Sequence, residues 1–316
     1  MDVLDGLIFK IKGAGYFVTS HGKEYRCYLR GKFRIVDSEE SVLPVVGDRV
    51  RFKTIEDASS SELRGMIVEV LPRKSVLKRA DPSKKYRGKI IAANLDQVFI
   101  VVSVAQPKPN RRFLDRLIVA AESDSIEPVI CVNKIDLATD IEEVKNNFSV
   151  YDELGYRVLF TSAETSEGID ELREMMRDKL SIMAGPSGTG KTSLIARIQP
   201  GLELKVGSVS EKSGKGRHTT THFELHPLDE GGYIGDTPGM REFGIVGLSP
   251  DELSGYFREF TEFSKACRFS PCTHSHEPQC AVKEAVESGK VDRERYESYL
   301  RILESLKEAE GEFWKR

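Results

Sequence analysis

Short runs of alternating apolar and polar residues fill the first 73 positions of the chain, with glycine and proline between them. They predict five β-strands, at Gly6–Ile11, Gly15–Thr19, Lys23–Leu29, Arg49–Phe52 and Gly65–Val70. Five short strands in about 70 residues are typical of a small closed barrel such as an OB-fold, which often binds oligonucleotides. We therefore expect an N-terminal β-barrel, and nucleic-acid binding by this barrel is a hypothesis.

Strand and helix patterns alternate from Gln97 onward. Gln97–Val104 is almost continuously apolar, which indicates a strand covered on both faces of its sheet. Further strands are predicted at Pro128–Val132, Arg157–Phe160, Ser181–Ala184, His222–Leu225 and Gly232–Gly235, and helices at Arg111–Ser123, Ile141–Leu154 and Gly168–Lys179. This alternation predicts an α/β domain with a doubly wound, mostly parallel sheet.

The chain becomes helical and acidic after Ser249, with helices expected at Ala281–Ser288 and Asp292–Ala309. Basic residues instead dominate the segment from Arg73 to Lys89, where only Asp81 opposes them. That segment is interpreted either as a solvated linker or as a flexible strap that contacts phosphates. We thus expect four parts: a β-barrel at 1–73, a basic linker at 74–95, the α/β domain at 96–248 and a mostly helical domain at 249–316.

Composition and charge limit the class of protein. The chain is 39% hydrophobic and 31% charged, and no apolar run reaches the roughly 20 residues of a membrane span. Its first residues lack the basic and apolar regions of a signal peptide, so we expect a cytoplasmic protein without a membrane partner. Residues 1–90 contain 19 Lys and Arg against 12 Asp and Glu, which favours an anionic partner; a solvated basic face is the alternative.

A phosphate-binding loop is predicted between the strand Ser181–Ala184 and the helix that follows it. The sequence Gly185-Pro186-Ser187-Gly188-Thr189-Gly190-Lys191-Thr192-Ser193 fits G-x-x-x-x-G-K-[ST] and continues into that helix. The glycines let backbone N–H groups turn toward phosphate oxygens, and the helix N-terminus adds partial positive charge. Lys191 can reach the β- and γ-phosphates, and the Thr192 hydroxyl can ligate Mg²⁺.

A guanine-specific motif, Asn133-Lys134-Ile135-Asp136, follows the strand Pro128–Val132. The Asp136 carboxylate can accept hydrogen bonds from the guanine N1–H and exocyclic amine, a pattern that adenine lacks. Asn133 can bond the acceptor edge of the base and neighbouring loops, and the Lys134 stem can lie over the ring. Thr161-Ser162-Ala163 follows the next strand, and a backbone N–H near Ala163 could contact the guanine oxygen.

Two later segments are expected to complete a nucleotide site with Mg²⁺. Asp236 of the sequence Asp236-Thr237-Pro238-Gly239 would hold the ion, and the Gly239 N–H would sense the γ-phosphate. One residue of Thr219–Thr221 would add a second hydroxyl to Mg²⁺; Thr220 is preferred, and the choice among the three stays open. The loop that carries them is expected to become ordered only when a γ-phosphate is bound.

These motifs come in a rotated order. An ordinary small GTPase runs phosphate loop, threonine loop, D-x-x-G, N-K-x-D and then S-A, whereas this chain begins with N-K-x-D and S-A. Such a circular permutation can keep the same sheet, because the sites are spatial and natural termini lie close together. We therefore interpret residues 96–248 as a circularly permuted GTPase domain whose two nucleotide-responsive segments lead directly into the C-terminal domain.

Three of the five cysteines are clustered near histidines, which favours a metal site over disulfides in a cytoplasmic chain. The spacing Cys267-x4-Cys272-x-His274-x5-Cys280 offers three thiolates and an imidazole, a closed tetrahedral set for one structural Zn²⁺. His276 is a competing ligand, and His274 is preferred because it closes a compact knuckle. Cys27 and Cys131 lie in apolar alternation and are expected in the core.

The permuted order, the preceding barrel and the cysteine pattern together resemble the RsgA (YjeQ) family of small-ribosomal-subunit-dependent GTPases, over nearly the whole chain. Residues 216–221, 236–244 and 276–282 are especially similar to that family, with Gln279 in place of an expected glycine. The resemblance implies hydrolysis of GTP to GDP and phosphate, stimulated by the 30S subunit during its late maturation, with nucleotide state controlling ribosome affinity. It also implies contacts to 16S rRNA from the barrel and the zinc domain. We expect a monomer.

Hydrolysis needs a group that orients the attacking water, and many GTPases place a glutamine directly after D-x-x-G. This chain has Met240 there, so we expect slow intrinsic hydrolysis. His218, in the threonine loop, is the best candidate for the missing group, and the resemblance points the same way; Lys191 is the second catalytic candidate. The alternative is that His218 is a solvated or RNA-contacting loop residue.

Three other functions stay open on sequence grounds. An ATP-using P-loop enzyme is disfavoured by Asp136, and a passive RNA-binding scaffold would not turn over GTP. A permuted GTPase of the large subunit is disfavoured only by the resemblance of the barrel and the cysteine segment to the small-subunit family. Nucleotide competition and GTP turnover with each ribosomal subunit distinguish these functions.

Overall fold

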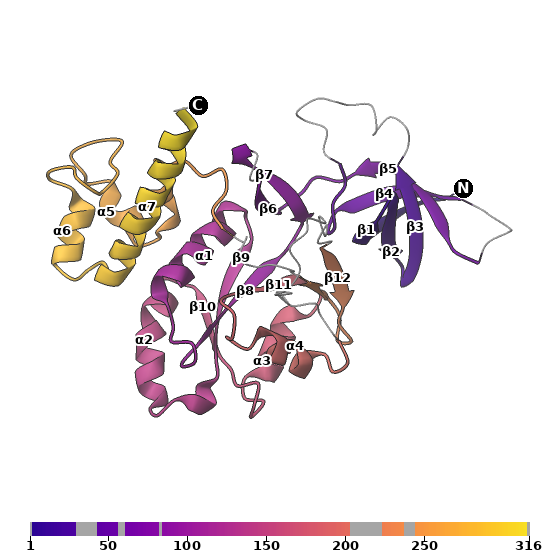
Figure 1. The fold of residues 1–316 in the computed structure, drawn as a ribbon, viewed down its shortest axis with the longest axis horizontal. Coiled ribbons are helices and arrows are strands. Elements are labelled where there is room, and N and C mark those ends of the chain that lie inside the picture. Colours follow the sequence, from indigo (N-terminus) through magenta and orange to yellow (C-terminus); the bar gives the residue numbers. More distant parts are fainter. Residues whose placement is uncertain are drawn as a thin grey trace, which may run out of the picture.

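The computed structural model describes residues 2–29, 43–55, 61–81, 84–202, 223–236 and 244–314. They form a β-barrel, a central α/β unit and a helical unit, and the barrel and the helical unit lie at opposite ends of the molecule (Figure 1). Of the helices in these ranges, none combines the length and the apolar character that a bilayer crossing requires.

The N-terminal unit is a closed barrel of five strands in the order β1-β2-β3-β5-β4. The strands are β1 (Val3–Lys12), β2 (Gly15–Ser20), β3 (Lys23–Leu29), β4 (Arg49–Ile55) and β5 (Arg64–Val70). β3 and β5 are parallel, while the other neighbours are antiparallel. Cys27 and Phe52 are fully buried in the barrel core, where a Cβ on Gly65 would lie 2.6 Å from the Phe52 ring. The predicted OB-type barrel is confirmed.

The basic segment predicted as a linker contains a two-stranded antiparallel hairpin, β6 (Val76–Asp81) and β7 (Lys84–Ala93). The apolar ends of the hairpin explain this difference, because Leu77 and Ala92 are buried in the core of the α/β unit. The segment Arg73–Lys89, interpreted as a solvated linker or a flexible strap, thus contains strands; its contact with phosphates stays a prediction. The limits of the four domains stay predictions.

Two basic side chains of the same segment form ion pairs within the protein. Arg73 Nη2 lies 2.7 Å from the fully buried Asp48 carboxylate of the barrel, and Lys78 Nζ lies 2.9 Å from Asp124 Oδ1 of the α/β unit. These two side chains stabilise the junction between the barrel and the sheet, so their charge is already matched inside the chain.

The α/β unit contains a six-stranded sheet in the order β10-β9-β8-β11-β13-β12. Its strands are β8 (Gln97–Ser103), β9 (Glu127–Asn133), β10 (Arg157–Phe160), β11 (Leu180–Ala184), β12 (Glu224–Pro227) and β13 (Tyr233–Asp236). All neighbours are parallel except β12 and β13, and every residue of β8 is buried. The mostly parallel sheet predicted from the sequence is confirmed.

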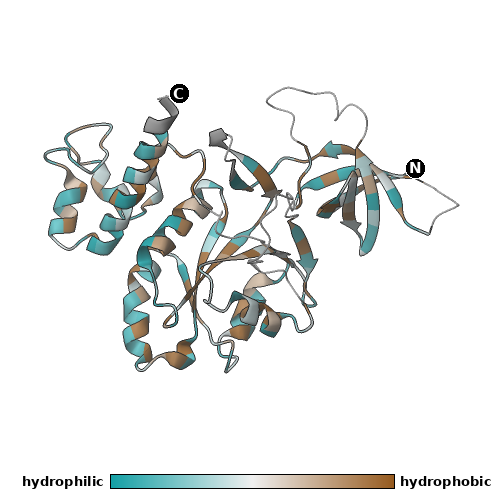
Figure 2. Ribbon diagram, in the orientation of Figure 1, coloured by the Kyte–Doolittle hydropathy of each residue, from teal (hydrophilic) through white to brown (hydrophobic). Residues whose placement is uncertain are grey.

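Helices cover both faces of this sheet (Figure 1). The helices α1 (Arg111–Ser123) and α2 (Ile141–Glu153) pack on one face, and α3 (Ile169–Met176) and α4 (Lys191–Ile198) pack on the other. Successive residues of a strand point to opposite faces, so Val98 and Ile100 pack toward α1 while Phe99 and Val101 pack toward α3 and α4. Figure 2 shows hydrophobic residues along these central strands, as expected for a sheet covered twice.

The C-terminal unit is mostly helical. Its elements are η4 (Leu253–Tyr256), α5 (Phe260–Ser264), α6 (Ala281–Glu287) and α7 (Arg293–Trp314). The short helix η2 (Ile135–Leu137) belongs instead to the α/β unit. The core of the C-terminal unit contains the fully buried Phe257, Phe260 and Tyr299, and Val119 of α1 belongs to the same cluster. The helical unit therefore packs directly on the α/β unit.

Arg295 of α7 is the largest of the fully buried side chains in the described residues. Its Nη1 lies 2.7 Å from Asp115 Oδ1 of α1, and its Nε lies 2.7 Å from Glu259 Oε1. Burial by itself would lower the pKa of Arg295, but the two carboxylates outweigh this effect and raise the pKa well above its usual value. The guanidinium therefore stays charged and links the helical unit to α1.

Replacing this guanidinium tests how much the junction contributes to stability. Arg295→Ala leaves two carboxylates buried without their partner, so we expect a loss of about 3–5 kcal/mol in the free energy of unfolding. Arg301→Ala is the matched control on the same helix, because Arg301 and Glu304 are both more than 60% exposed and such pairs contribute about 0.5 kcal/mol. Thermal and urea unfolding measure the free energy of unfolding of both variants. Equal losses for Arg295→Ala and Arg301→Ala would contradict a stabilising role of the Arg295 ion pairs.

Candidate functional site

The predicted nucleotide motifs lie at the carboxyl ends of neighbouring strands. Asn133 ends β9 and residues 134–136 follow it, residues 161–163 follow β10 and residues 185–192 follow β11, while Asp236 ends β13. Because these strands are parallel, their carboxyl ends meet at one edge of the sheet, where ligands bind in open α/β folds. The rotated order of the motifs therefore does not separate them in space.

The phosphate loop has the left-handed backbone that its glycines allow. Gly185, Gly188 and Gly190 have φ values of 143°, 84° and 93°. A Cβ on Gly185 would lie 2.2 Å from the Val101 carbonyl oxygen, and one on Gly190 would lie 2.3 Å from Asn133 Nδ2. Gly190 is the N-cap of α4, so the first backbone N–H groups of this helix face the loop. Ser187, Thr192 and Ser193 are exposed on the loop and the first turn of the helix.

Lys191 folds back over the phosphate loop. Its Nζ donates hydrogen bonds to the carbonyl oxygens of Gly185 at 2.8 Å and Pro186 at 2.7 Å. The side chain is 8% exposed, and burial lowers the pKa of its ammonium group. An anion beside Nζ would offset that cost, which is the chemistry expected of a phosphate-binding lysine.

Asn133 joins the guanine motif to the two other loops. Its Nδ2 donates to the Thr189 carbonyl oxygen at 2.8 Å, and its Oδ1 accepts from the Thr161 hydroxyl at 3.2 Å. The residue is 1% exposed. Of the two roles expected for Asn133, the structure shows the contact with neighbouring loops.

Asp136 and Ser162 form a second link between the same loops. The buried Ser162 hydroxyl donates to Asp136 Oδ1, and Ser162 Oγ accepts the N–H groups of Glu164 at 3.2 Å and Thr165 at 3.1 Å. Asp136 itself is exposed at the edge of the sheet. The carboxylate is thus oriented by the T-S-A loop.

The turn after β8 belongs to this site although no sequence motif predicted it. Lys134 Nζ donates to the carbonyl oxygen of Gln106, and Pro107 Cδ lies 3.6 Å from the Cβ position of Gly188. Its position in the sequence could have indicated this, since the turn directly follows a buried parallel strand and so lies at the carboxyl edge of the sheet, where the other loops of the site lie.

The remaining predicted site residues lie outside the described residues. They are His218, Thr219–Thr221 and Gly239, together with the side chain of Asp236. Their predicted roles in hydrolysis and in Mg²⁺ binding, and the predicted ordering of the threonine loop, therefore stay predictions.

The four predicted metal ligands come together in the helical unit. The ligand atoms of Cys267, Cys272, His274 and Cys280 all lie within 4.8 Å of one another. Cys280 Sγ is 3.8 Å from both other sulfur atoms and 3.4 Å from His274 Nδ1. This donor set could hold a metal ion. His274 lies in this cluster, as the sequence favoured, whereas His276 bonds Ser275 Oγ; the ligand role of His274 stays a prediction.

The loop that holds the cluster contains a non-glycine residue with a positive φ. Gln279, where a glycine was expected, has a φ of 55°, the left-handed region that glycine adopts most easily. Glu277 closes the loop by accepting the Thr273 N–H at 2.8 Å and the Ser275 N–H at 3.0 Å. Burial alone would raise the pKa of Glu277, but a hydrogen bond from the Thr273 hydroxyl at 2.6 Å and these backbone hydrogen bonds outweigh it and lower the pKa to about 2. The carboxylate therefore stabilises the loop at neutral pH.

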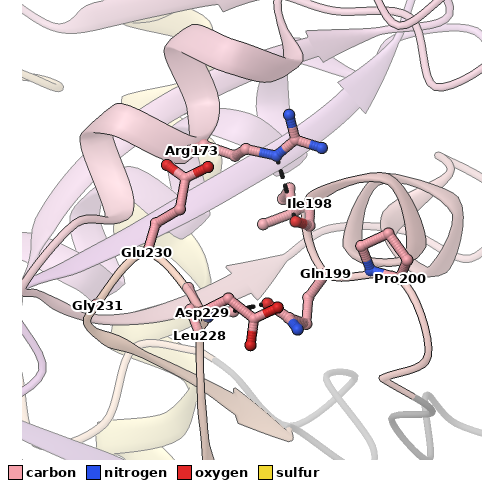
Figure 3. Close-up of a pocket in the computed structure, with 8 residues that line it drawn as sticks. All are labelled: Arg173, Ile198, Gln199, Pro200, Leu228, Asp229, Glu230 and Gly231. Carbon is pink, nitrogen blue, oxygen red and sulfur yellow. Dashed lines mark hydrogen bonds between the residues drawn. The ribbon is translucent and has the colours of Figure 1, made fainter.

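A separate groove of about 310 Å³ lies at the far end of α4 (Figure 3). It is lined by Arg173, Ile198, Gln199, Pro200, Leu228, Asp229, Glu230 and Gly231. Arg173 Nε donates to the Ile198 carbonyl oxygen at 3.2 Å, and the Asp229 N–H donates to Gln199 Oε1 at 3.0 Å. Since α4 begins at the phosphate loop and ends at this groove, the groove is not the nucleotide site.

The permuted sheet and its phosphate loop define a P-loop protein of the circularly permuted GTPase class. The RsgA GTPase family model matches residues 70–246, and the RsgA N-terminal domain model matches residues 5–61. This chain belongs to the RsgA GTPase family.

Relatives match the chain along its whole length. The "Small ribosomal subunit biogenesis GTPase RsgA" of Caldanaerobacter subterraneus subsp. tengcongensis is 44% identical and covers 100% of both chains. The protein of the same name from Chlorobaculum parvum is 43% identical and covers 97% of this chain and 99% of its own. The crystal structure of YjeQ from Thermotoga maritima is 36% identical, with a TM-score of 0.80 over 96% of this chain and 99% of that chain. YloQ, described as a circularly permuted GTPase, is 29% identical, with a TM-score of 0.76 over 97% and 96%.

Proposed function

We propose that this protein is a GTPase that binds the small ribosomal subunit and hydrolyses GTP to GDP and phosphate during late maturation of that subunit. The observation that carries the proposal is the hydrogen bond from Asn133 to the Thr189 carbonyl, which joins a guanine motif to a phosphate loop. The names of the full-length relatives supply the ribosomal part of the proposal.

The base would be held by the loops after β9 and β10. Asp136 accepts the guanine N1–H and the exocyclic amine, and the Ser162 hydroxyl keeps its carboxylate oriented. The stem of Lys134 covers one face of the ring, and the backbone near Ala163 meets the guanine oxygen. Asn133 and Thr161 hold these two loops at a fixed distance from the phosphate loop.

The phosphates would be held by residues 185–193. Backbone N–H groups of the loop and of the first turn of α4 surround the β-phosphate, and Lys191 exchanges its two carbonyl partners for β- and γ-phosphate oxygens. The exposed Thr192 hydroxyl would bind Mg²⁺, together with Thr220 and Asp236. Gly239 would contact the γ-phosphate, and Mg²⁺, when bound, would neutralise charge on the transferred phosphoryl group.

Nucleotide state would reach the ribosome-binding parts through the strands beside the site. Lys10 of the barrel donates a hydrogen bond to Glu224 at the start of β12, close after the threonine loop. β13 leads through the D-T-P-G segment toward the helical unit. A change in either segment would therefore alter how the barrel or the helical unit meets 16S rRNA, which is how we propose that nucleotide controls affinity for the 30S subunit. We further propose that the protein is cytoplasmic and monomeric.

We propose Zn²⁺ as the single metal ion of the helical unit. A tetrahedron with zinc–sulfur bonds of about 2.3 Å has edges of about 3.8 Å, in agreement with the 3.8 Å sulfur–sulfur distances at Cys280. Four protein ligands leave no open position, so the ion is structural. Tyr296 and Tyr299 donate hydrogen bonds to the carbonyl oxygens of His274 and Thr273 and couple the cluster to α7.

The central experiment measures GTP turnover by the full chain with and without purified small subunits. We expect slow turnover alone and an acceleration on the order of 100-fold with small subunits, because a positioned catalytic group contributes that much. Large subunits are the control and should not accelerate turnover, and ATP should not compete with GTP for binding. Stimulation by large subunits alone, or equal binding of ATP, would refute the proposal.

His218→Ala tests the residue that we propose orients the attacking water. GTP binding should be unchanged, while turnover stimulated by small subunits should fall about 100-fold. Binding of a fluorescent GTP analogue and single-turnover kinetics separate the two effects. Normal stimulated turnover in this variant would show that His218 is a solvated or RNA-contacting residue.

A pair of histidine variants tests the metal site. His274→Ala should lower the zinc content from about one ion per chain toward zero and lower the melting temperature of the helical unit, because metal binding and folding are coupled. His276→Ala is the matched control and should keep the metal. Elemental analysis of the purified proteins gives the answer, and retention of zinc by both variants would contradict the ligand set.

A further inference from the structure

The turn at residues 103–107 is held in place by two hydrogen bonds. Ser103, the last residue of β8, is 1% exposed, and its Oγ donates to the Pro107 carbonyl oxygen at 2.7 Å. The Val104 N–H donates to the Asn133 carbonyl oxygen at 3.1 Å. The turn is therefore closed on itself and tied to the first residue of the N-K-x-D loop.

Two non-glycine residues with left-handed backbones face each other across this junction. Gln106 has a φ of 52° and Lys134 has a φ of 64°. The Gln106 carbonyl oxygen accepts the hydrogen bond from Lys134 Nζ. Such backbone conformations are uncommon outside glycine and persist where the surroundings hold them, often at functional sites.

The same turn lies beside the phosphate loop. Pro107 Cδ is 3.6 Å from the Cβ position of Gly188, and Lys134 Cε is 4.0 Å from that of Gly190. The Thr189 carbonyl of the phosphate loop already accepts the Asn133 amide. The Lys134 ammonium is held by the turn, so the turn sets the direction of the lysine stem.

We propose that the turn at 103–107 is a positioning element for guanine nucleotides, with Ser103 as its positioning residue. Ser103 fixes the turn, the Gln106 carbonyl fixes the Lys134 ammonium, and the stem of Lys134 is thereby held where the base stacks. Fixing this flexible side chain before the nucleotide arrives reduces the entropy lost on binding. This inference rests on the proposed guanine site and adds a part of the chain that lies outside its motifs.

The proposal predicts which kinetic constant changes. A contact with the base is the same before and during hydrolysis, so its loss should raise KM without changing kcat. Ser103→Ala should raise the Kd for GDP and the KM for GTP about threefold to tenfold, the usual effect of one lost hydrogen bond. Ser103→Thr keeps the hydroxyl and should restore most of the affinity.

A double-mutant cycle separates positioning from general damage. Lys134→Met keeps the stem but removes the ammonium group, and it should weaken GDP binding to a similar extent. Because both changes break the same tether, Ser103→Ala should add little in the Lys134→Met background. Ser123→Ala is the matched control: its hydroxyl donates to the Ala120 carbonyl at 3.0 Å at the end of α1, and its removal should leave the Kd for GDP unchanged.

Gln106 offers an independent variant if Ser103→Ala folds poorly. A β-branched side chain disfavours positive φ, whereas glycine adopts it readily, so Gln106→Val should weaken GDP binding more than Gln106→Gly. The inference would be overturned if the effects of Ser103→Ala and Lys134→Met on GDP binding were additive, or if Ser103→Ala left the Kd for GDP unchanged. In either case guanine binding by the unmodified chain would still stand. Failure of the unmodified chain to prefer GDP over ADP would instead refute the proposed function.

Discussion

The buried side chain of Asn133 is the contact on which the nucleotide site depends. The side-chain Nδ2 donates a hydrogen bond to the phosphate loop, and the side-chain Oδ1 accepts one from the T-S-A loop. One residue therefore sets the spacing between the groups expected to bind the base and the phosphates. Gly190 has no side chain because that amide occupies the space where a Cβ would lie. The parallel sheet brings the loops to one edge, and the hydrogen bonds of Asn133 then fix their positions relative to one another.

The motifs could be predicted from the sequence because their chemistry is local. Glycines before Lys191 and an aspartate three residues after Asn133 keep their spacing in any fold that uses them. The barrel could also be predicted, since alternation with a period of two specifies which side chains are buried. The position of His274 beside the three cysteines could be predicted for the same reason, since the four residues are close together in the sequence.

Features that depend on contacts between distant segments could not be predicted. The hairpin formed by β6 and β7 was predicted as a linker because basic residues outnumber the few apolar residues that pack into the core of the α/β unit. Arg295 gave no sign of burial, since its partners Asp115 and Glu259 are far from it in the chain. The turn at 103–107 carries no recognisable motif, because its contact with Lys134 is made by a backbone carbonyl and only the single hydroxyl of Ser103 fixes the turn.

Ion pairs of different exposure join the ends of the molecule to its centre: the barrel uses the buried Arg73–Asp48 pair and the partly exposed Lys10–Glu224 pair, and the helical unit uses the buried Arg295. Arg295 and its carboxylates are almost completely removed from water, whereas the side chains of Lys10 and Glu224 are 36% and 27% exposed. Dissolved ions screen a partly exposed pair far more than a buried one. Concentrated electrolyte, such as the counterion layer around a folded polyanion, therefore loosens the Lys10–Glu224 contact and leaves Arg295 in place. The ionic surroundings can thus weaken one contact of the barrel, while the buried Arg73–Asp48 and Arg295 ion pairs persist.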